Sequence, residues 1–489
     1  MIPKKESLIL ADKLVIYNNF AKINDCEGRL LVELQVYPAP RITWDFEILG
    51  TQVCQFPIIG VNLEQCFFAG YSLRVENLSV TNNFLGIGKT NASGNASRVF
   101  WGDLDVPAHT FHFCLTNTKF QEKCLAQYSL QETINERRFT NDEYDNSLRR
   151  LRNVGKFIET SLNSIWSVRL EIWEESLQWL KQQNGSIGTR LTCMGELFQP
   201  QRTEESDNFP NLLANITVSE AQEILRNLCQ LLSYANGGFI APIFIEAERY
   251  NPEGQEIPRI KAISALTRTD YQVTSIEQLG NSWLTMQSDL KSFISCFSSF
   301  EKMLAQPFWK DTFYFVLVQY FQAIRGGNWE LAASATGAAL ERLSHAILVE
   351  DQTDPMIKVD FENLFSSDRR LRDPANQRLG SGTKVTETRL RLLLERIGLT
   401  TDDTQEVKNF LDVRNDAVHP KVSGMIQNQR WQLILRGIQW IDEVLLWRLG
   451  YHGKYINRIA YAAMIFDSTP SPTLEITPRY DLSSRDPNW

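Results

Sequence analysis

The chain has 489 residues, of which 43% are hydrophobic and 22% are charged, and its formal net charge is −8 at pH 7. These fractions are typical of a globular protein with room for several domains, and they exclude a low-complexity chain. The negative charge argues against a surface that binds nucleic acid nonspecifically. No apolar run reaches the ~20 residues that a membrane helix needs, and the N-terminus lacks the apolar core of a secretory signal. We therefore expect a cytoplasmic protein with no membrane partner.

The eight cysteines are scattered over the first 300 residues and form no C-x-x-C pair. This spacing fits neither a zinc framework nor a small disulfide scaffold. We expect reduced thiols in a core, no metal site and no cofactor.

Residues 1–280 are predicted to form a β-rich α+β region. Apolar and polar residues alternate at 29–37, 42–48 and 109–115, which favours an antiparallel sandwich or an open barrel. Strand-like runs follow at 164–173, 189–198, 239–246 and 260–266. Thr217 and Glu220 have the spacing of a capping box at the start of a helix that Gly237-Gly238 ends. We interpret this region as a sensing or regulatory part, either one domain or two subdomains, with no catalytic constellation.

Residues 281–465 are predicted to form an all-α bundle. Helical patterns cover 283–304, 311–325, 329–349, 383–397, 403–418 and 429–449, and a connector is expected at 351–382. The Pro- and Ser-containing tail, residues 466–489, is expected to be an extended arm or disordered.

One motif near the end of the bundle combines an arginine, an asparagine and a histidine within six positions. Val407, Phe410 and Leu411 recur at helical spacing and place Arg414 on or beside the buried face of a helix. Pro420 disfavours helical geometry at His419, so the helix is expected to end there. The imidazole, freed from the helix, can then turn back toward the guanidinium.

The pattern of Arg414, Asn415 and His419 resembles the HEPN family, and within it the ApeA-like branch, where RN-xxx-H lies on a late helix. The resemblance covers roughly residues 285–460. It implies a HEPN helical bundle that acts as a homodimer. It also implies that the segment 337–343 is the early long helix, whose acidic residue, Glu341, faces the motif.

These residue types suit RNA cleavage without a metal ion. A histidine titrates near neutrality and can transfer protons to or from the ribose 2′-OH and the leaving oxygen. A planar guanidinium stabilises the charge that builds on the phosphate. We therefore assign catalytic roles to Arg414, Asn415 and His419, with Glu341 and Asp416 as supporting residues. Each motif has one histidine, so two copies across a dimer would supply acid and base.

Plainer interpretations exist for the same residues. An arginine near a helix end can neutralise the helix dipole, a histidine before proline can be a simple cap, and Glu341 can be a structural partner of Arg414. Arg369, Arg370 and Arg372 can contact RNA phosphates, or they can belong to a solvated loop.

The predicted function is a metal-independent HEPN endoribonuclease in a defence or toxin-like role, such as anti-phage growth arrest. RNA is the expected substrate, and a phage-derived or nucleic-acid trigger is expected to act on the N-terminal region. The alternative is a non-catalytic HEPN protein that binds nucleic acid or a nucleotide, or that only dimerises.

Overall fold

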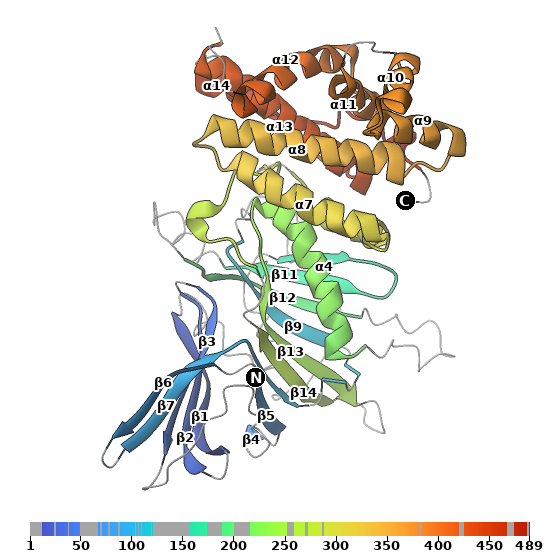
Figure 1. The fold of residues 1–489 in the computed structure, drawn as a ribbon. Helices are drawn as coiled ribbons and strands as arrows, with labels where there is room; N and C mark the ends of the chain where they lie inside the picture. Colours follow the sequence, from blue (N-terminus) through green and yellow to red (C-terminus); the bar gives the residue numbers. More distant parts are fainter. Residues whose placement is uncertain are drawn as a thin grey trace, which may run out of the picture. The chain divides into compact units, whose positions relative to one another are not determined.

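In the computed structural model the chain separates into two compact units, Met1–Gln278 and Leu279–Trp489 (Figure 1). The described residues are 12–120 with short gaps and a longer one at 49–66, then 157–173, 188–199, 216–251, 259–268, 272–285 and 288–489. Within the last range, residues 381–383, 420–424, 467–473 and 487–488 are not described.

The first unit contains a five-stranded antiparallel sheet. Its strand order is β1 (Lys13–Ile23), β2 (Cys26–Gln35), β3 (Arg41–Ile48), β7 (Lys89–Ala96) and β6 (Ser79–Gly86). In β2 the apolar residues Leu30, Val32 and Leu34 are buried and alternate with more exposed residues. The alternation in the sequence thus reflects a strand with one buried face and one more exposed face.

A nine-stranded sheet makes up most of the rest of the first unit. In spatial order its strands are β10 (Phe157–Ser161), β11 (Ser167–Ile172), β12 (Leu191–Phe198), β9 (Thr110–Thr116), β13 (Pro242–Asn251), β14 (Arg259–Arg268), β8 (Arg98–Gly102), β5 (Tyr71–Glu76) and β4 (Phe67–Phe68). Helix α4 (Val218–Asn236) lies against this sheet, and a 3₁₀ turn, η2 (Ile276–Gln278), ends the unit (Figure 1). The predicted capping box forms: the Thr217 N–H donates to Glu220 at 2.8 Å, and the Glu220 N–H donates to the Thr217 hydroxyl at 3.2 Å.

Buried apolar side chains of the two sheets form one cluster. Val32 and Trp44 of the first sheet belong to it together with Cys114, Met194 and Ile243 of the second. In the described part of this unit, two sheets share a core and helix α4 packs against one of them, which confirms the prediction of a β-rich α+β region.

The cysteines follow the sequence expectation only in part. Cys114, Cys193, Cys229 and Cys296 are free and buried, as expected of core thiols. Cys26, however, is disulfide-bonded, so the expectation of reduced thiols is wrong for this residue. Its position at the start of β2 is set by strand pairing, which the cysteine spacing alone does not reveal.

The second unit is helical, which confirms the predicted class of the C-terminal region. Its helices are α5 (Leu290–Ser295), α6 (Phe297–Leu304), α7 (Pro307–Ile324), α8 (Trp329–His345), α9 (Pro355–Phe365), α10 (Arg369–Arg378), α11 (Val385–Arg396), α12 (Thr401–Val418), α13 (Gln427–Leu449) and α14 (Arg458–Phe466). A π-helical turn, η3 (Ala346–Glu350), continues α8. The short strands β15 (Tyr455–Ile456) and β16 (Glu475–Ile476) pair, and a 3₁₀ turn, η4 (Leu482–Ser484), follows.

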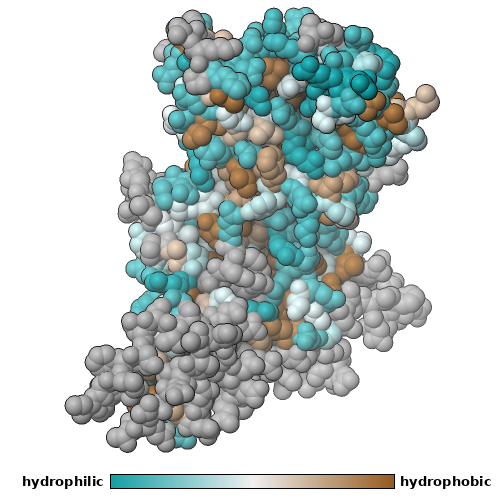
Figure 2. Space-filling model, viewed as in Figure 1, coloured by the Kyte–Doolittle hydropathy of each residue, from teal (hydrophilic) through white to brown (hydrophobic). Residues whose placement is uncertain are grey.

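Helix α8 occupies the centre of this bundle. It packs against α7, α11, α12 and α13, and Figure 1 shows α7 running alongside it. Its buried residues are mostly small, including Ala332, Ala335 and Ala339, and small side chains let neighbouring helices approach closely. Figure 2 shows that the visible face over these helices is largely hydrophilic with scattered apolar residues, as expected when the large apolar groups fill the core.

The expected connector at 351–382 is wrong, because it contains α9 and α10. Each begins with an aspartate cap: Asp354 accepts from the Met356 N–H and Asp368 from the Arg370 N–H, both at 2.9 Å. The sequence of α10 is strongly polar and includes Pro374, so it carries no apolar stripe to reveal a helix.

The described part of the tail, residues 474–486 and 489, is an ordered arm that is anchored to the bundle. Arg479 donates to Asp403 at 3.0 Å and to Glu443 at 2.7 Å, and the Trp489 ring stacks on the guanidinium of Arg448 at 4.0 Å. These contacts join the arm to α12 and α13. Of the two possibilities predicted for the tail, an extended arm or disorder, the described residues therefore form the arm.

Among the described residues, no helix is long and apolar enough to cross a membrane.

Candidate functional site

Helix α12 presents the sequence motif at its C-terminal end. Val407, Phe410 and Val413 are fully buried, and the Phe410 ring meets Trp440 of α13 edge to face at 5.8 Å between centroids. This packing fixes the rotation of the helix about its axis. Arg414, the next residue, therefore lies at the edge of the buried face, where its side chain is 28% exposed.

Arg414 is hydrogen-bonded on both sides. Its Nη2 donates to Oε1 of Glu341 on α8 at 3.1 Å, and its Nη1 donates to Oδ1 of Asn415 at 3.3 Å. Glu341 is 34% exposed, so the ion pair is partly open to water. The structure thus brings together three of the predicted residues, Arg414, Asn415 and Glu341.

Gly337 leaves room for the guanidinium of Arg414 to reach Glu341. A Cβ on Gly337 would lie 2.9 Å from Cγ of Arg414 and 3.2 Å from its Nε. The arginine side chain therefore lies on the surface of α8, one turn before Glu341.

His419 caps the end of α12. Its backbone N–H donates to the Asn415 carbonyl at 2.8 Å, its φ of −127° leaves the helical region, and the residue is exposed. With the residues that the structure describes, the imidazole makes no hydrogen bond or ion pair. The helix ends where Pro420 predicts, but the described contacts do not join His419 to Arg414.

The remaining predicted residues lie apart from this pair. Asp416 is half-buried and has no hydrogen bond or ion pair to the described chain. Arg369 and Arg370 are exposed, and Arg372 pairs with Asp373 at 3.4 Å. These three arginines belong to helix α10, so the loop assumed for them is wrong.

A small pocket of about 280 Å³ opens beside the motif. It is lined by Lys384, Val385, Thr386, Leu411, Arg414 and Asn415. A lysine, a guanidinium and an amide in one hollow can together bind an anion such as a phosphate group.

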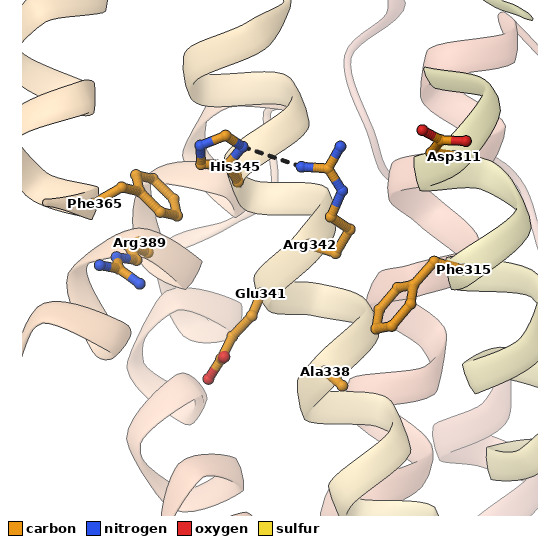
Figure 3. A pocket seen from close by; sticks show the side chains of 8 residues that line it. All are labelled: Asp311, Phe315, Ala338, Glu341, Arg342, His345, Phe365 and Arg389. Carbon is orange, nitrogen blue, oxygen red and sulfur yellow. Dashed lines mark hydrogen bonds between the residues drawn. The ribbon is translucent and has the colours of Figure 1, made fainter. Parts of the chain in front are cut away.

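A larger pocket of about 720 Å³, which the sequence motif did not predict, lies over the next turns of α8 (Figure 3). Its lining residues are Asp311, Phe315, Ala338, Glu341, Arg342, His345, Phe365 and Arg389. Glu341 belongs both to this pocket and to the ion pair with Arg414. In the sequence, this pocket could have been predicted from the spacing of Glu341 and His345. The two residues are four positions apart and are therefore neighbours on one face of a helix.

In the described parts of the chain, no three His, Cys, Asp or Glu residues are arranged to hold a metal ion.

Comparison with known proteins gives one match to a family model. No curated protein and no solved structure matches the chain. Residues 306–468, from α7 to the end of α14, match the model described as the YopA C-terminal domain. The match covers about a third of the chain and does not confirm the ApeA-like HEPN resemblance, which remains a prediction. The helical unit is therefore similar, over residues 306–468, to the YopA C-terminal domain.

Proposed function

We propose that the helical unit is a metal-independent endoribonuclease of the HEPN type, close to the ApeA-like branch. The observation that carries the proposal is the pocket beside the motif, in which Arg414 and Asn415 stand next to Lys384. Arg414 is fixed by two hydrogen bonds and still more than a quarter exposed, so a phosphate in this pocket can reach it.

In the proposed reaction the ribose 2′-OH attacks the adjacent phosphate. A base takes the proton from the 2′-OH, and an acid protonates the leaving 5′-oxygen, which leaves a 2′,3′-cyclic phosphate. His419 is the proton-transfer group, since an exposed imidazole can accept a proton at one ring nitrogen and donate one from the other. Arg414 stabilises the negative charge on the phosphate, and Asn415 holds the guanidinium in position. A second copy of the chain would supply the other histidine.

The wider role belongs to the same proposal. A ribonuclease that depletes cellular RNA would act in defence or as a toxin in the cytoplasm. The N-terminal unit would sense a phage-derived or nucleic-acid trigger and raise the cleavage rate above a basal level.

The second candidate function is a non-catalytic HEPN module that binds nucleic acid or a nucleotide, or that only dimerises. One observation supports it. The charge of Arg414 is already neutralised by Glu341, and His419 makes no described contact with either residue. In this case Arg414 holds α12 against α8, and His419 is a helix cap.

The deciding experiment incubates purified protein with total RNA in EDTA and analyses the fragment ends. Wild type is expected to give fragments with 2′,3′-cyclic phosphate, and Arg414→Ala and His419→Ala are expected to give none. His452→Ala is the matched control, because His452 is also exposed but lies in the turn after α13. If all four proteins leave RNA intact, or if Arg414→Ala and His419→Ala cut as well as wild type and His452→Ala do, the nuclease proposal fails.

A cellular assay tests the wider role. Wild type expressed from an inducible promoter is expected to arrest growth, and His419→Ala is expected to allow normal growth at equal protein level. Sedimentation of both proteins should show dimers. A monomeric protein that still cuts RNA would contradict the shared site.

A further inference from the structure

The larger pocket has a floor and two walls, all within the helical unit. Ala338, Glu341, Arg342 and His345 of α8 form the floor (Figure 3). One wall is α7, with Asp311 and Phe315, and the other is Phe365 of α9 with Arg389 of α11. With about 720 Å³, it has the size of pockets that hold small organic ligands.

The pocket continues the candidate active site along α8. Gly337, Glu341 and His345 follow one another at intervals of four residues, so they form one stripe on the helix. Arg414 covers Gly337 and binds Glu341, and His345 comes one turn later in the larger pocket. A ligand in this pocket would therefore lie next to a phosphate held by Arg414.

The α9–α11 wall carries the positive charge. The Arg389 guanidinium stacks on the Phe365 ring at 4.0 Å and donates to the Leu364 carbonyl at 3.0 Å. Burial and the nearby charge of Arg372 lower the pKa of Arg389, while Glu341 raises it. Its buried Nε has no hydrogen-bond partner within the described chain. An anion beside Arg389 would offset both the burial and the repulsion between the two arginines.

His345 is held in place by residues of α8, η3 and α9. Its Nδ1 lies 3.1 Å from Nη1 of Arg342 and 3.3 Å from Glu350, and its ring meets Phe365 edge to face. Figure 3 shows Nδ1 turned to Arg342 and the other ring nitrogen on the opposite side, toward Phe365. That nitrogen can bind a phosphate oxygen on the same wall as Arg389.

The α7 wall offers an aromatic ring and a carboxylate. Phe315 is 40% exposed and makes no ring contact with the described residues, so one face is available for stacking. Asp311 lies one turn earlier and has no ion pair or hydrogen bond in the described chain. A carboxylate repels phosphate but accepts hydrogen bonds from an amino group such as that of a nucleobase. The two walls therefore favour opposite ends of a nucleotide.

We propose that this pocket binds a nucleotide, with its phosphate between His345 and Arg389 and its base against Phe315. The inference rests in part on the proposed function, because a nucleotide in an RNA chain would place its neighbouring phosphate at Arg414. The same chemistry fits a free nucleotide. The test therefore measures binding, separately from cleavage.

The experiment titrates full-length His419→Ala protein, which should not consume RNA, with 5′-AMP, adenosine and inorganic phosphate by calorimetry. A second series uses a short oligoribonucleotide with 2′-O-methyl groups, which cannot be cut through the 2′-OH. AMP or the oligonucleotide is expected to bind more tightly than adenosine or phosphate alone. Binding of AMP indicates a free nucleotide, and binding of the oligonucleotide alone indicates a unit of RNA.

Two substitutions and their matched controls locate the binding. Arg389→Leu is expected to weaken binding about tenfold or more, because a charged hydrogen bond is lost. Arg391→Leu is its control: Arg391 also lies on α11 and donates to a backbone carbonyl, that of Leu379 at 2.9 Å, but does not line the pocket. Phe315→Ala, on an exposed side chain that tolerates truncation, is expected to weaken binding several-fold, whereas the neighbouring Tyr314→Ala is not.

The outcomes separate this inference from the nuclease proposal. If neither AMP nor the oligonucleotide binds, the pocket is not a nucleotide site. The same conclusion follows if Phe315→Ala and a folded Arg389→Leu bind the ligand with the affinity of their control variants. Neither result depends on the outcome of the cleavage assay. If binding depends on Arg389 and Phe315 while wild type cuts no RNA, the inference stands and the nuclease proposal fails.

Discussion

Gly337 of α8 lies directly beneath the side chain of Arg414 from α12. A Cβ at this position would approach Cγ of Arg414 to 2.9 Å, closer than carbon atoms normally come without a bond. The absence of a side chain at Gly337 therefore lets the guanidinium reach Glu341. One glycine on the central helix positions the arginine of the motif.

Gly337→Ala tests this relationship. The methyl group should displace Arg414, while the better helix propensity of alanine, about 1 kcal/mol, should offset most of the loss of packing. We expect thermal stability within about 1 kcal/mol of wild type and a clear loss of RNA cleavage or binding. Ser334→Ala on the same helix is the control, since it raises helix propensity without a methyl group against Arg414. Unchanged RNA activity in Gly337→Ala would show that the position of Arg414 is unimportant.

Glu341→Gln is expected to strengthen RNA binding. The carboxylate neutralises Arg414 at 3.1 Å, and its removal frees one positive charge for phosphate. Because both partners are partly exposed, the stability change should stay below about 1 kcal/mol. RNA affinity measured over a range of salt concentrations should show a steeper dependence on salt. The control is Glu395→Gln, which breaks the exposed pair with Arg391 on α11. Equal affinities for both variants would refute the prediction.

Arg458→Met is expected to destabilise the helical unit by roughly 3–5 kcal/mol. Arg458 pairs with Asp442 at 2.6 Å, and the two side chains are 3% and 0% exposed. Removing the arginine leaves a buried carboxylate with its charge uncompensated. Thermal denaturation should show the loss, and the double variant Arg458→Met/Asp442→Leu should recover much of it. Arg378→Met, which breaks an exposed pair with Asp360, should cost less than about 1 kcal/mol. A small effect of Arg458→Met would mean that water reaches Asp442.

Asp403 is expected to make the helical unit sensitive to acid. Burial raises the pKa of Asp403, but the charge of Arg479 and hydrogen bonds from Trp440, Arg479 and Thr400 outweigh it and hold the pKa below its usual value. A lowered pKa contributes stability above the unfolded-state value of about 3.9, and this contribution is lost as the pH falls through the folded-state value.

Asp403→Asn should therefore be less stable than wild type at pH 7, with a smaller difference between the two near pH 3. Urea unfolding followed by tryptophan fluorescence at both pH values measures this difference. Asp402→Asn is the control, because Asp402 is exposed and makes no described hydrogen bond or ion pair. An equal difference at both pH values would contradict the linkage to this carboxylate.

Local patterns in the sequence were sufficient for the elements whose signals lie within a few residues. The helix predicted at 403–418 is α12, Thr401–Val418, because its apolar spacing and Pro420 act within single turns. The capping box at Thr217 also forms as predicted. Helix α10 was not predicted, because a polar helix with an internal proline has no periodic stripe of apolar residues.

The sequence by itself determined the order of a β-rich region and a helical bundle, and the position of Arg414, Asn415 and His419 at a helix end. Only the tertiary structure decided what surrounds them. The pairing of Arg414 with Glu341 spans 73 positions, and Arg479 reaches Asp403 across 76. The pocket at His345 joins residues from four helices. Hydrophobic periods and caps act between near neighbours, whereas these contacts depend on how whole helices pack, which no short stretch of sequence encodes.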